Sequence, residues 1–274
     1  MQRVMRNTAS LVVLAAALTG AFGAAQAADL AAAPVYTKAP VAIEEWNPWM
    51  VRVRALGVLP DGKSSLRVLD SPTFGTALDS PRSSLNFSDT LVPEVDVSYF
   101  FTRNLAVEVI TGLPPRASIT GTGLLAGLPV GKASGFAPTL TFQYHFTNLG
   151  AFQPYVGVGA NYTTFYNVKA ANQTACVASA LIAYPTCAGG GLPATVTRLG
   201  IADSFGAVAQ IGFDYMIDKH WGINFDVKRV WMRPEYSATV VNPPLTPGGP
   251  TTVHSVGTAH VDPWLVGAGV TYKF

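Results

Sequence analysis

The sequence has 274 residues, of which 49% are hydrophobic and only 12% are charged, about half the charged share of an ordinary soluble domain. This composition excludes a disordered chain, and two cysteines are too few for a disulfide-rich scaffold. Arg3 and Arg6 account for the net charge of +2, because the rest of the chain carries as many basic as acidic residues. No nucleic-acid partner is therefore expected, because such a partner requires a basic excess.

Residues 1–27 predict a cleaved export signal. Two arginines precede an apolar run at 11–22, which is shorter than the roughly 20 residues that a membrane-spanning helix needs. Ala25-Gln26-Ala27 fits the small-x-small pattern of a cleavage site, so the mature chain is expected to start at Ala28. An uncleaved anchor helix is the alternative. An exported chain of this composition is either a soluble periplasmic domain or an outer-membrane β-barrel.

From Trp49 onward the chain alternates with a period of two, which is typical of β-strands. In the first such segment Val51 and Val53 occupy one face, and Arg52 and Arg54 occupy the other. The lengths of most segments are close to the roughly 9–11 residues that a tilted membrane strand needs. The eight predicted strands are 49–56, 93–101, 105–110, 139–146, 154–165, 204–216, 221–232 and 259–274.

The connections between these strands alternate between short and long. Short ones lie at 102–104, 147–153 and 217–220, and long ones at 59–91, 112–135, 166–203 and 233–257. This predicts an all-β fold, an eight-stranded antiparallel transmembrane barrel over 49–274, with short periplasmic turns and long extracellular loops. A soluble β-sandwich would also alternate, but its outer face would be rich in Lys and Glu. Here one face carries aromatic and aliphatic side chains instead.

Aromatic residues gather at the strand ends near the short turns, as in the interfacial girdle of membrane barrels. Examples are Trp49, Tyr99, Tyr144 and Trp221. The last strand ends with Gly269, Tyr272 and a C-terminal Phe274, which resembles the signal that outer-membrane barrels present to the barrel-insertion machinery. The expected location is the bacterial outer membrane, with membrane lipids, lipopolysaccharide and that machinery as partners.

Segments spread over nearly the whole mature chain carry a family resemblance. They are WMVRVRALGVLPD (49–61), PEVDVSYFFTRNLAVEV (93–109), PTLTFQYHF (138–146), FQPYVGVGANYTTFYN (152–167), DSFGAVAQIGFDYMIDKHWGINFDVK (203–228) and VDPWLVGAGVTYKF (261–274). In order and spacing they resemble the OmpW family of eight-stranded outer-membrane proteins. The second long loop departs from the family by lacking a His-containing stretch, and the third carries an insertion with both cysteines. Residues 28–48 resemble a flexible periplasmic lead-in.

The inward-facing residues change character with height. The lower layer contains charges of both signs and is expected to form a hydrogen-bonded floor, because unpaired charges are costly in a lumen of low dielectric. This polar floor comprises Arg52, Arg54, Glu94, Asp96, Glu108, His145, Asp214, Asp226 and Lys228. The upper layer is apolar and comprises Leu56, Val58, Ile110, Val208, Val230, Met232 and Leu265.

An apolar upper lumen over a polar floor fits a hydrophobic pocket that is open to the outside. Alternatively, these residues only fill the barrel interior. The family resemblance implies passage of small hydrophobic molecules, and a closed floor would require a lateral exit. Pro93 and Pro138 lack the N–H of a ladder hydrogen bond and are candidates for opening one, although a strand-end or bulge role is equally compatible.

The remaining residues with chemical potential do not assemble into a site. Cys176 and Cys187 lie in one outer loop, where export favours a disulfide over a metal site. The four histidines show no ligand spacing and no Ser–His pair suggests catalysis, so neither metal, cofactor nor enzymatic activity is expected. The rival interpretation is a non-conducting structural or surface-interaction barrel that acts through its extracellular loops.

Overall fold

The computed structural model describes residues 46–69, 79, 81–177, 187–188, 191–242 and 251–274. The expected export signal lies outside these residues, as does all of the expected lead-in except 46–48. Among the described residues there is no helix long and apolar enough to cross a bilayer. By its contacts, Trp46–Phe274 forms one unit, and the description below concerns this unit.

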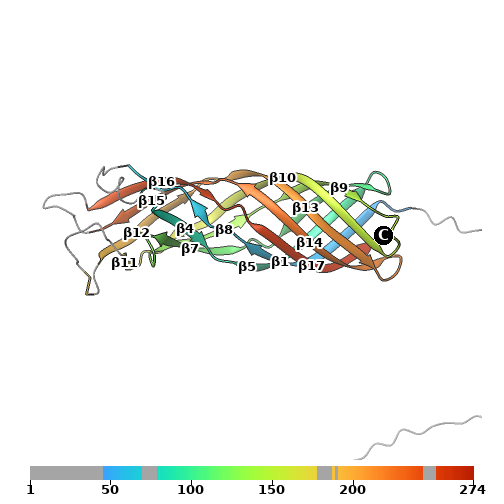
Figure 1. The fold of residues 1–274 in the computed structure, drawn as a ribbon, viewed down its shortest axis with the longest axis horizontal. Helices are drawn as coiled ribbons and strands as arrows, with labels where there is room; N and C mark the ends of the chain where they lie inside the picture. The colour runs from blue at the N-terminus through green and yellow to red at the C-terminus, as the bar shows by residue number, and fades with distance from the viewer. Residues whose placement is uncertain (1–45, 70–78, 80, 178–186, 189–190, 243–250) are drawn as a thin grey trace, which may run out of the picture. The chain divides into compact units, whose positions relative to one another are not determined.

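Eight strands pair antiparallel into a closed cylinder (Figure 1). They are β1 (Trp49–Leu59), β5 (Thr90–Phe100), β6 (Leu105–Gly112), β9 (Thr139–His145), β10 (Phe152–Ala170), β13 (Ser204–Met216), β14 (Trp221–Met232) and β17 (Trp264–Lys273). In the order β13, β14, β17, β1, β5, β6, β9, β10 each strand pairs with the next, and β10 pairs back to β13. The predicted eight-stranded antiparallel barrel is confirmed.

The last barrel strand begins later than the alternation predicted. Residues 259–260 belong to a separate strand, β16 (Thr252–His260), and β17 starts only at Trp264. Between them Asp262 has a φ of +28°, and Pro263 has no N–H to donate. One continuous ladder therefore cannot pass through this point, which explains why the single predicted strand at 259–274 is wrong at its start.

The long connections contain further strands, which the alternation pattern does not predict. They are β2 (Lys63–Ser64), β3 (Arg67–Val68), β4 (Ser83–Phe87), β7 (Arg116–Gly123), β8 (Pro129–Phe136), β11 (Thr174–Val177), β12 (Leu192–Ile201) and β15 (Glu235–Val241), in addition to β16. The order β10–β8–β7–β4 prolongs the barrel sheet, and β11–β12–β15–β16–β2 forms a second sheet to which β3 adds. In Figure 1 β11, β12, β15 and β16 lie at the end opposite the C-terminus.

An apolar cluster explains why these connections fold. Buried side chains from the second sheet, such as Val196 and Tyr236, pack with Ile119 and Val130 of the prolonged barrel sheet and with Val230 of β14. Each connection strand is too short to be stable alone, and burial of its apolar face against the others supplies the stabilisation. The two sheets therefore extend the barrel at the end with the long connections.

The barrel strands separate an inner from an outer face as expected. In β1, Arg52 is fully buried in the lumen, whereas its neighbour Val53 is 48% exposed on the outer face. At the short-turn end the outward aromatic rings form edge-to-face pairs. Trp49 with Tyr99 and Trp221 with Tyr272 have ring centroids 5.0 and 4.8 Å apart. This arrangement is an interfacial aromatic girdle.

The short turns are held by local hydrogen bonds. In the turn between β13 and β14, the backbone N–H groups of His220 and Trp221 both donate to Oδ1 of Asp218 at 2.7 Å. These bonds stabilise the ionised carboxyl and lower the pKa of Asp218. The C-terminal Phe274 returns to this end of the barrel and donates from its N–H to the carbonyl of Trp49, which closes β17 against β1.

Candidate functional site

Arg52 in β1 is buried in the lumen and holds carboxylates from two other strands. Its Nε and Nη2 donate to the two oxygens of Asp214 in β13, at 3.1 and 2.6 Å. Its Nη1 pairs with Glu108 in β6 and lies 3.4 Å from the hydroxyl of Ser98 in β5. Bidentate arginine–carboxylate pairs are among the strongest polar contacts in proteins. One guanidinium thus connects four of the eight barrel strands.

Arg54 and Lys228 form the layer above. Arg54 donates from Nε to Oε1 of Glu94 at 2.9 Å, and its Nη2 pairs with Asp96. Nζ of Lys228 lies 3.0 Å from the same Glu94 oxygen and 2.7 Å from Oδ1 of Asp226. Both cations come from inward positions of their strands, which the period-two alternation predicted. Every buried cation of this layer therefore faces at least two carboxylates.

Neutral polar side chains, which the predicted polar floor does not include, complete the network. They are Ser98, Gln143, Tyr155, Gln210, Asn224 and Thr271. The hydroxyl of Tyr155 donates to Asp226 at 2.9 Å, and Gln143 donates to Oε1 of Glu108 at 2.7 Å. The predicted floor residue His145 shares a hydrogen bond of 2.9 Å with Oε1 of Gln143 and stacks on the Tyr155 ring. The six neutral residues could have been identified from their inward parity in β5, β9, β10, β13, β14 and β17.

A glycine on the neighbouring strand, directly opposite Tyr155 in the β10–β13 ladder, makes room for the Tyr155 ring. A Cβ added to Gly212 in β13 would lie 2.5 Å from the Tyr155 hydroxyl oxygen and 2.6 Å from the ring carbon that carries it. Both distances are far below van der Waals contact. Gly212 is thus a packing requirement of the floor.

Together with the neutral polar side chains, the polar floor closes the lumen. Each of the eight barrel strands contributes a member, including β17, whose Thr271 hydroxyl donates to Asp214 at 2.5 Å. Arg52, Asp96, Glu108, Asp214 and Asp226 have no accessible surface. A continuous column of water cannot pass side chains that are fully buried, so the described residues leave no aqueous channel along the barrel axis.

An apolar cavity of about 170 Å³ lies above the polar floor. Of the predicted upper-layer residues, the structure places Leu56, Val58, Ile110, Val230, Met232 and Leu265 on its wall. Val208 is buried in the neighbouring apolar cluster and does not line the cavity. The inward parity of Val208 in β13 could not show whether it lines the cavity or packs in the apolar cluster.

Ten of the 36 residues that line the cavity belong to the strands of the long connections. Leu85 of β4, Ile119 of β7, Leu199 of β12 and Tyr236 of β15 all line it. The Tyr236 hydroxyl donates to the carbonyl of Ser65 at 2.8 Å, and burial raises the pKa of Tyr236 to about 12. The roof is therefore uncharged, whereas Glu94 and Lys228 bring charge to the cavity only from below.

The barrel wall beside the cavity has a break in its hydrogen-bond ladder. Pairing of β5 with β6 ends at Glu94↔Gly112, and pairing of β6 with β9 ends at Ile110↔Thr139. Beyond these pairs the N–H of Leu113 donates to the carbonyl of Pro93 at 3.1 Å, but proline has no N–H to return.

The segment Leu113–Pro115 forms the centre of this break, and we call residues 111–115 with 136–138 the wall break. Thr111, Leu113 and Ala137 of the wall break line the cavity from one side, and Leu113 is 64% exposed on the other. Pro138, the second predicted exit residue, accepts at its carbonyl from Tyr162 of β10, so its missing N–H faces β10. Only Pro93 of the two lacks its ladder donor on the side of the wall break.

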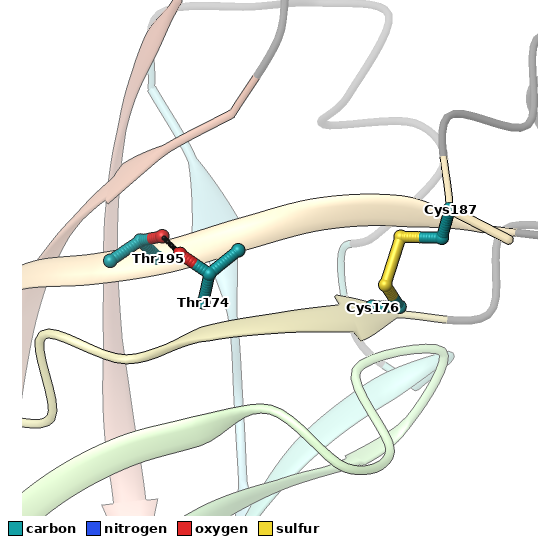
Figure 2. Close-up of a disulfide and its surroundings, with 4 residues drawn as sticks. All are labelled: Thr174, Cys176, Cys187 and Thr195. Carbon is teal, nitrogen blue, oxygen red and sulfur yellow. Dashed lines mark hydrogen bonds between the residues drawn. A yellow bond between two sulfur atoms is a disulfide. The ribbon is translucent and has the colours of Figure 1, made fainter.

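A disulfide joins Cys176 of β11 to Cys187, with their Cα atoms 6.3 Å apart. Figure 2 shows it beside the 2.7 Å hydrogen bond between the hydroxyls of Thr174 in β11 and Thr195 in β12. Neither cysteine lines the cavity. The disulfide closes the connection between β11 and β12 rather than taking part in the site.

Comparisons with known proteins agree with this architecture. The model of the OmpW family matches residues 48–274. An uncharacterized outer-membrane protein, y4mB of Sinorhizobium fredii, is 41% identical over 272 residues, which are 98% of this chain and 99% of that protein. A dibenzothiophene metabolism operon protein of Pseudomonas aeruginosa, PahQ, is 23% identical, with 74% of this chain and 82% of that protein covered.

Among solved structures, the outer membrane protein OprG from Pseudomonas aeruginosa superposes with a TM-score of 0.63 at 23% identity. The match covers 82% of this chain and 95% of OprG, so it supports the fold. The family model covers nearly all of the described barrel, and relatives of similar length are named as outer-membrane proteins. The chain is an outer-membrane β-barrel and belongs to the OmpW family.

Proposed function

We propose that this barrel takes up small hydrophobic molecules into its apolar cavity and releases them sideways into the membrane. The observation that carries the proposal is the combination of an apolar cavity with a closed polar floor beneath it. A molecule that enters from the outside cannot leave along the barrel axis. The operon name of the relative PahQ, dibenzothiophene metabolism, concerns an apolar aromatic compound and agrees with this substrate class.

The size of the cavity sets the size of the substrate. A dry cavity of about 150 Å³ lined by aliphatic and aromatic side chains is known to bind benzene. The present cavity of about 170 Å³ therefore suits a molecule of one or two aromatic rings, or an aliphatic chain of similar volume. Its binding energy would come from the removal of apolar surface from water, at roughly 25 cal/mol per Å².

The wall break supplies the exit in this proposal. A membrane barrel avoids unpaired backbone in contact with lipid, because each unsatisfied group costs several kcal/mol. At the wall break, prolines reduce that cost by removing donors, and exposed apolar side chains such as Leu91 and Leu113 line the outer side. An apolar molecule could pass here from the cavity to lipid without crossing the polar floor.

The cavity is tested by the uptake of naphthalene into cells with an intact lipopolysaccharide layer. The cells carry no barrel, the wild type, Leu56→Arg or the volume-conserving control Leu56→Met at equal surface abundance. We expect faster uptake with the wild type and with Leu56→Met, and basal uptake with Leu56→Arg. Equal uptake in all four strains would refute the proposal and favour the structural or surface-interaction barrel.

The exit is tested separately with Ala137→Trp, which fills the wall break, and with Ala160→Trp as its matched control. Ala160 is exposed on the outer face of β10 and does not line the cavity. We expect Ala137→Trp to slow naphthalene uptake to near the basal rate and Ala160→Trp to leave it unchanged. Full uptake with Ala137→Trp would show that the molecule leaves by another path.

A further inference from the structure

The lowest part of the cavity wall contains an acidic group that the polar floor does not use completely. Oε1 of Glu94 accepts from both Arg54 and Lys228. Oε2 of the same carboxylate has no hydrogen-bond or ion-pair partner among the described residues. The Glu94 side chain retains only 4% of its surface, and it lines the cavity. Its second oxygen is thus an acceptor, unpartnered among the described residues, on a nearly buried side chain of the cavity wall.

The cations nearest the cavity are already engaged. Nζ of Lys228, which also lines the cavity, lies within 3.0 Å of both Glu94 and Asp226. In the buried floor as a whole the carboxylates outnumber the lysine and arginine side chains by five to three. Among the other polar residues that line the cavity, Thr139, Asn161 and Thr163 hydrogen-bond to one another. The base of the cavity therefore offers an acceptor of negative charge and no free cation among the described residues.

From this geometry we infer that the cavity selects apolar molecules with one hydrogen-bond donor, an ammonium or a hydroxyl group, and rejects carboxylates. The donor binds Oε2 of Glu94, and the apolar body lies between Leu56, Ile110 and Val230 above it. A carboxylate in this orientation would meet a like charge in a low-dielectric site, which destabilises it. The inference rests on the proposed function and specifies the substrate class for the same cavity.

The test compares four one-ring compounds that differ in their polar group: 2-phenylethylamine, 2-phenylethanol, phenylacetate and ethylbenzene. Their binding to the purified full-length barrel in phosphatidylcholine nanodiscs is measured by saturation-transfer NMR, with empty nanodiscs subtracted. We expect the amine and the alcohol to bind at least about tenfold more tightly than phenylacetate, since a hydrogen bond to a charged group contributes that much. If phenylacetate binds the wild-type barrel as tightly as the amine does, the inference is overturned without any variant.

Glu94→Gln keeps an acceptor for Arg54 and Lys228 but removes the negative charge. The ratio of amine to phenylacetate affinity should fall at least about tenfold in this variant. Glu235→Gln is the matched control, because Glu235 is exposed at the start of β15 and does not line the cavity; it should leave the ratio unchanged. An unchanged ratio in Glu94→Gln would overturn the assignment of the selecting group.

Ethylbenzene separates this failure from a failure of the proposed function. If ethylbenzene binds the wild type and not Leu56→Arg while the polar group has no effect, the cavity is a hydrophobic site without the inferred selectivity. If none of the four compounds binds, the uptake proposal and the selectivity inference both fall.

Discussion

Replacement of Arg52 by methionine should destabilise the barrel more than the loss of the packing contacts of Arg52 alone would. The guanidinium makes a bidentate pair with Asp214, pairs with Glu108 and lies 4.7 Å from the centre of the Tyr155 ring. Methionine retains much of the apolar stem but leaves both carboxylates without this partner. Removal of one member of a buried ion pair typically costs about 3–5 kcal/mol, and we expect Arg52→Met to fall in this range.

The free energy of unfolding is measured by urea titration in phosphatidylcholine vesicles, with tryptophan fluorescence and heat-dependent gel mobility as independent readouts. Arg103→Met is the control, because Arg103 is exposed in the turn between β5 and β6. The double variant Arg52→Met with Asp214→Asn should recover part of the loss, since it removes one of the two uncompensated charges. A loss below about 1 kcal/mol, equal to that of Arg103→Met, would refute the reasoning, because such a value is typical of exposed charges.

Three further predictions follow from other parts of the structure. Gly212→Val should prevent folding, because its Cβ would lie 2.5 Å from the Tyr155 hydroxyl; a heat-modifiable gel band at wild-type yield would contradict this. Replacing Cys176 and Cys187 together by serine should leave the barrel folded but destabilise the β11–β12 connection by up to about 3 kcal/mol, the loop-entropy estimate. Limited proteolysis would show this as faster cleavage there, and equal rates would argue against it. In planar bilayers the wild type should show no stepwise ion current, and steady channel openings would mean that the polar floor is open.

The alternation of the barrel strands could be predicted because it has a simple physical cause. A strand that separates lipid from a lumen must place apolar and polar side chains on opposite faces, so Arg52 and Val53 reveal their directions from sequence alone. Charged residues in a strand indicate the inward face, since they cannot face hydrocarbon. The residue types of uncharged polar side chains such as Gln143 and Asn224 do not indicate a face by themselves, because the same side chains are common in turns and on soluble surfaces.

The upper half of the cavity could not be predicted from the same pattern. Ile119 and Tyr236 belong to short strands whose inward direction depends on the fold of the long connections, and those strands are stabilised only by packing against one another. The alternation of β13 likewise placed Val208 inside without showing that it is covered by the apolar cluster. Local periodicity indicates the face of a residue, whereas the contents of a cavity depend on contacts between segments distant in the chain.

The closed polar floor has a consequence for the cell that makes this protein. A barrel that leaves no column of water through its lumen adds no route for salts, sugars or polar toxins, so its abundance can rise without weakening the membrane as a barrier to them. The abundance of a wide, water-filled porin cannot rise in this way, because every additional copy increases the leakage of polar solutes. If the barrel takes up apolar molecules as proposed, the ion pairs around Arg52 and Arg54 allow this uptake without opening a path for polar solutes.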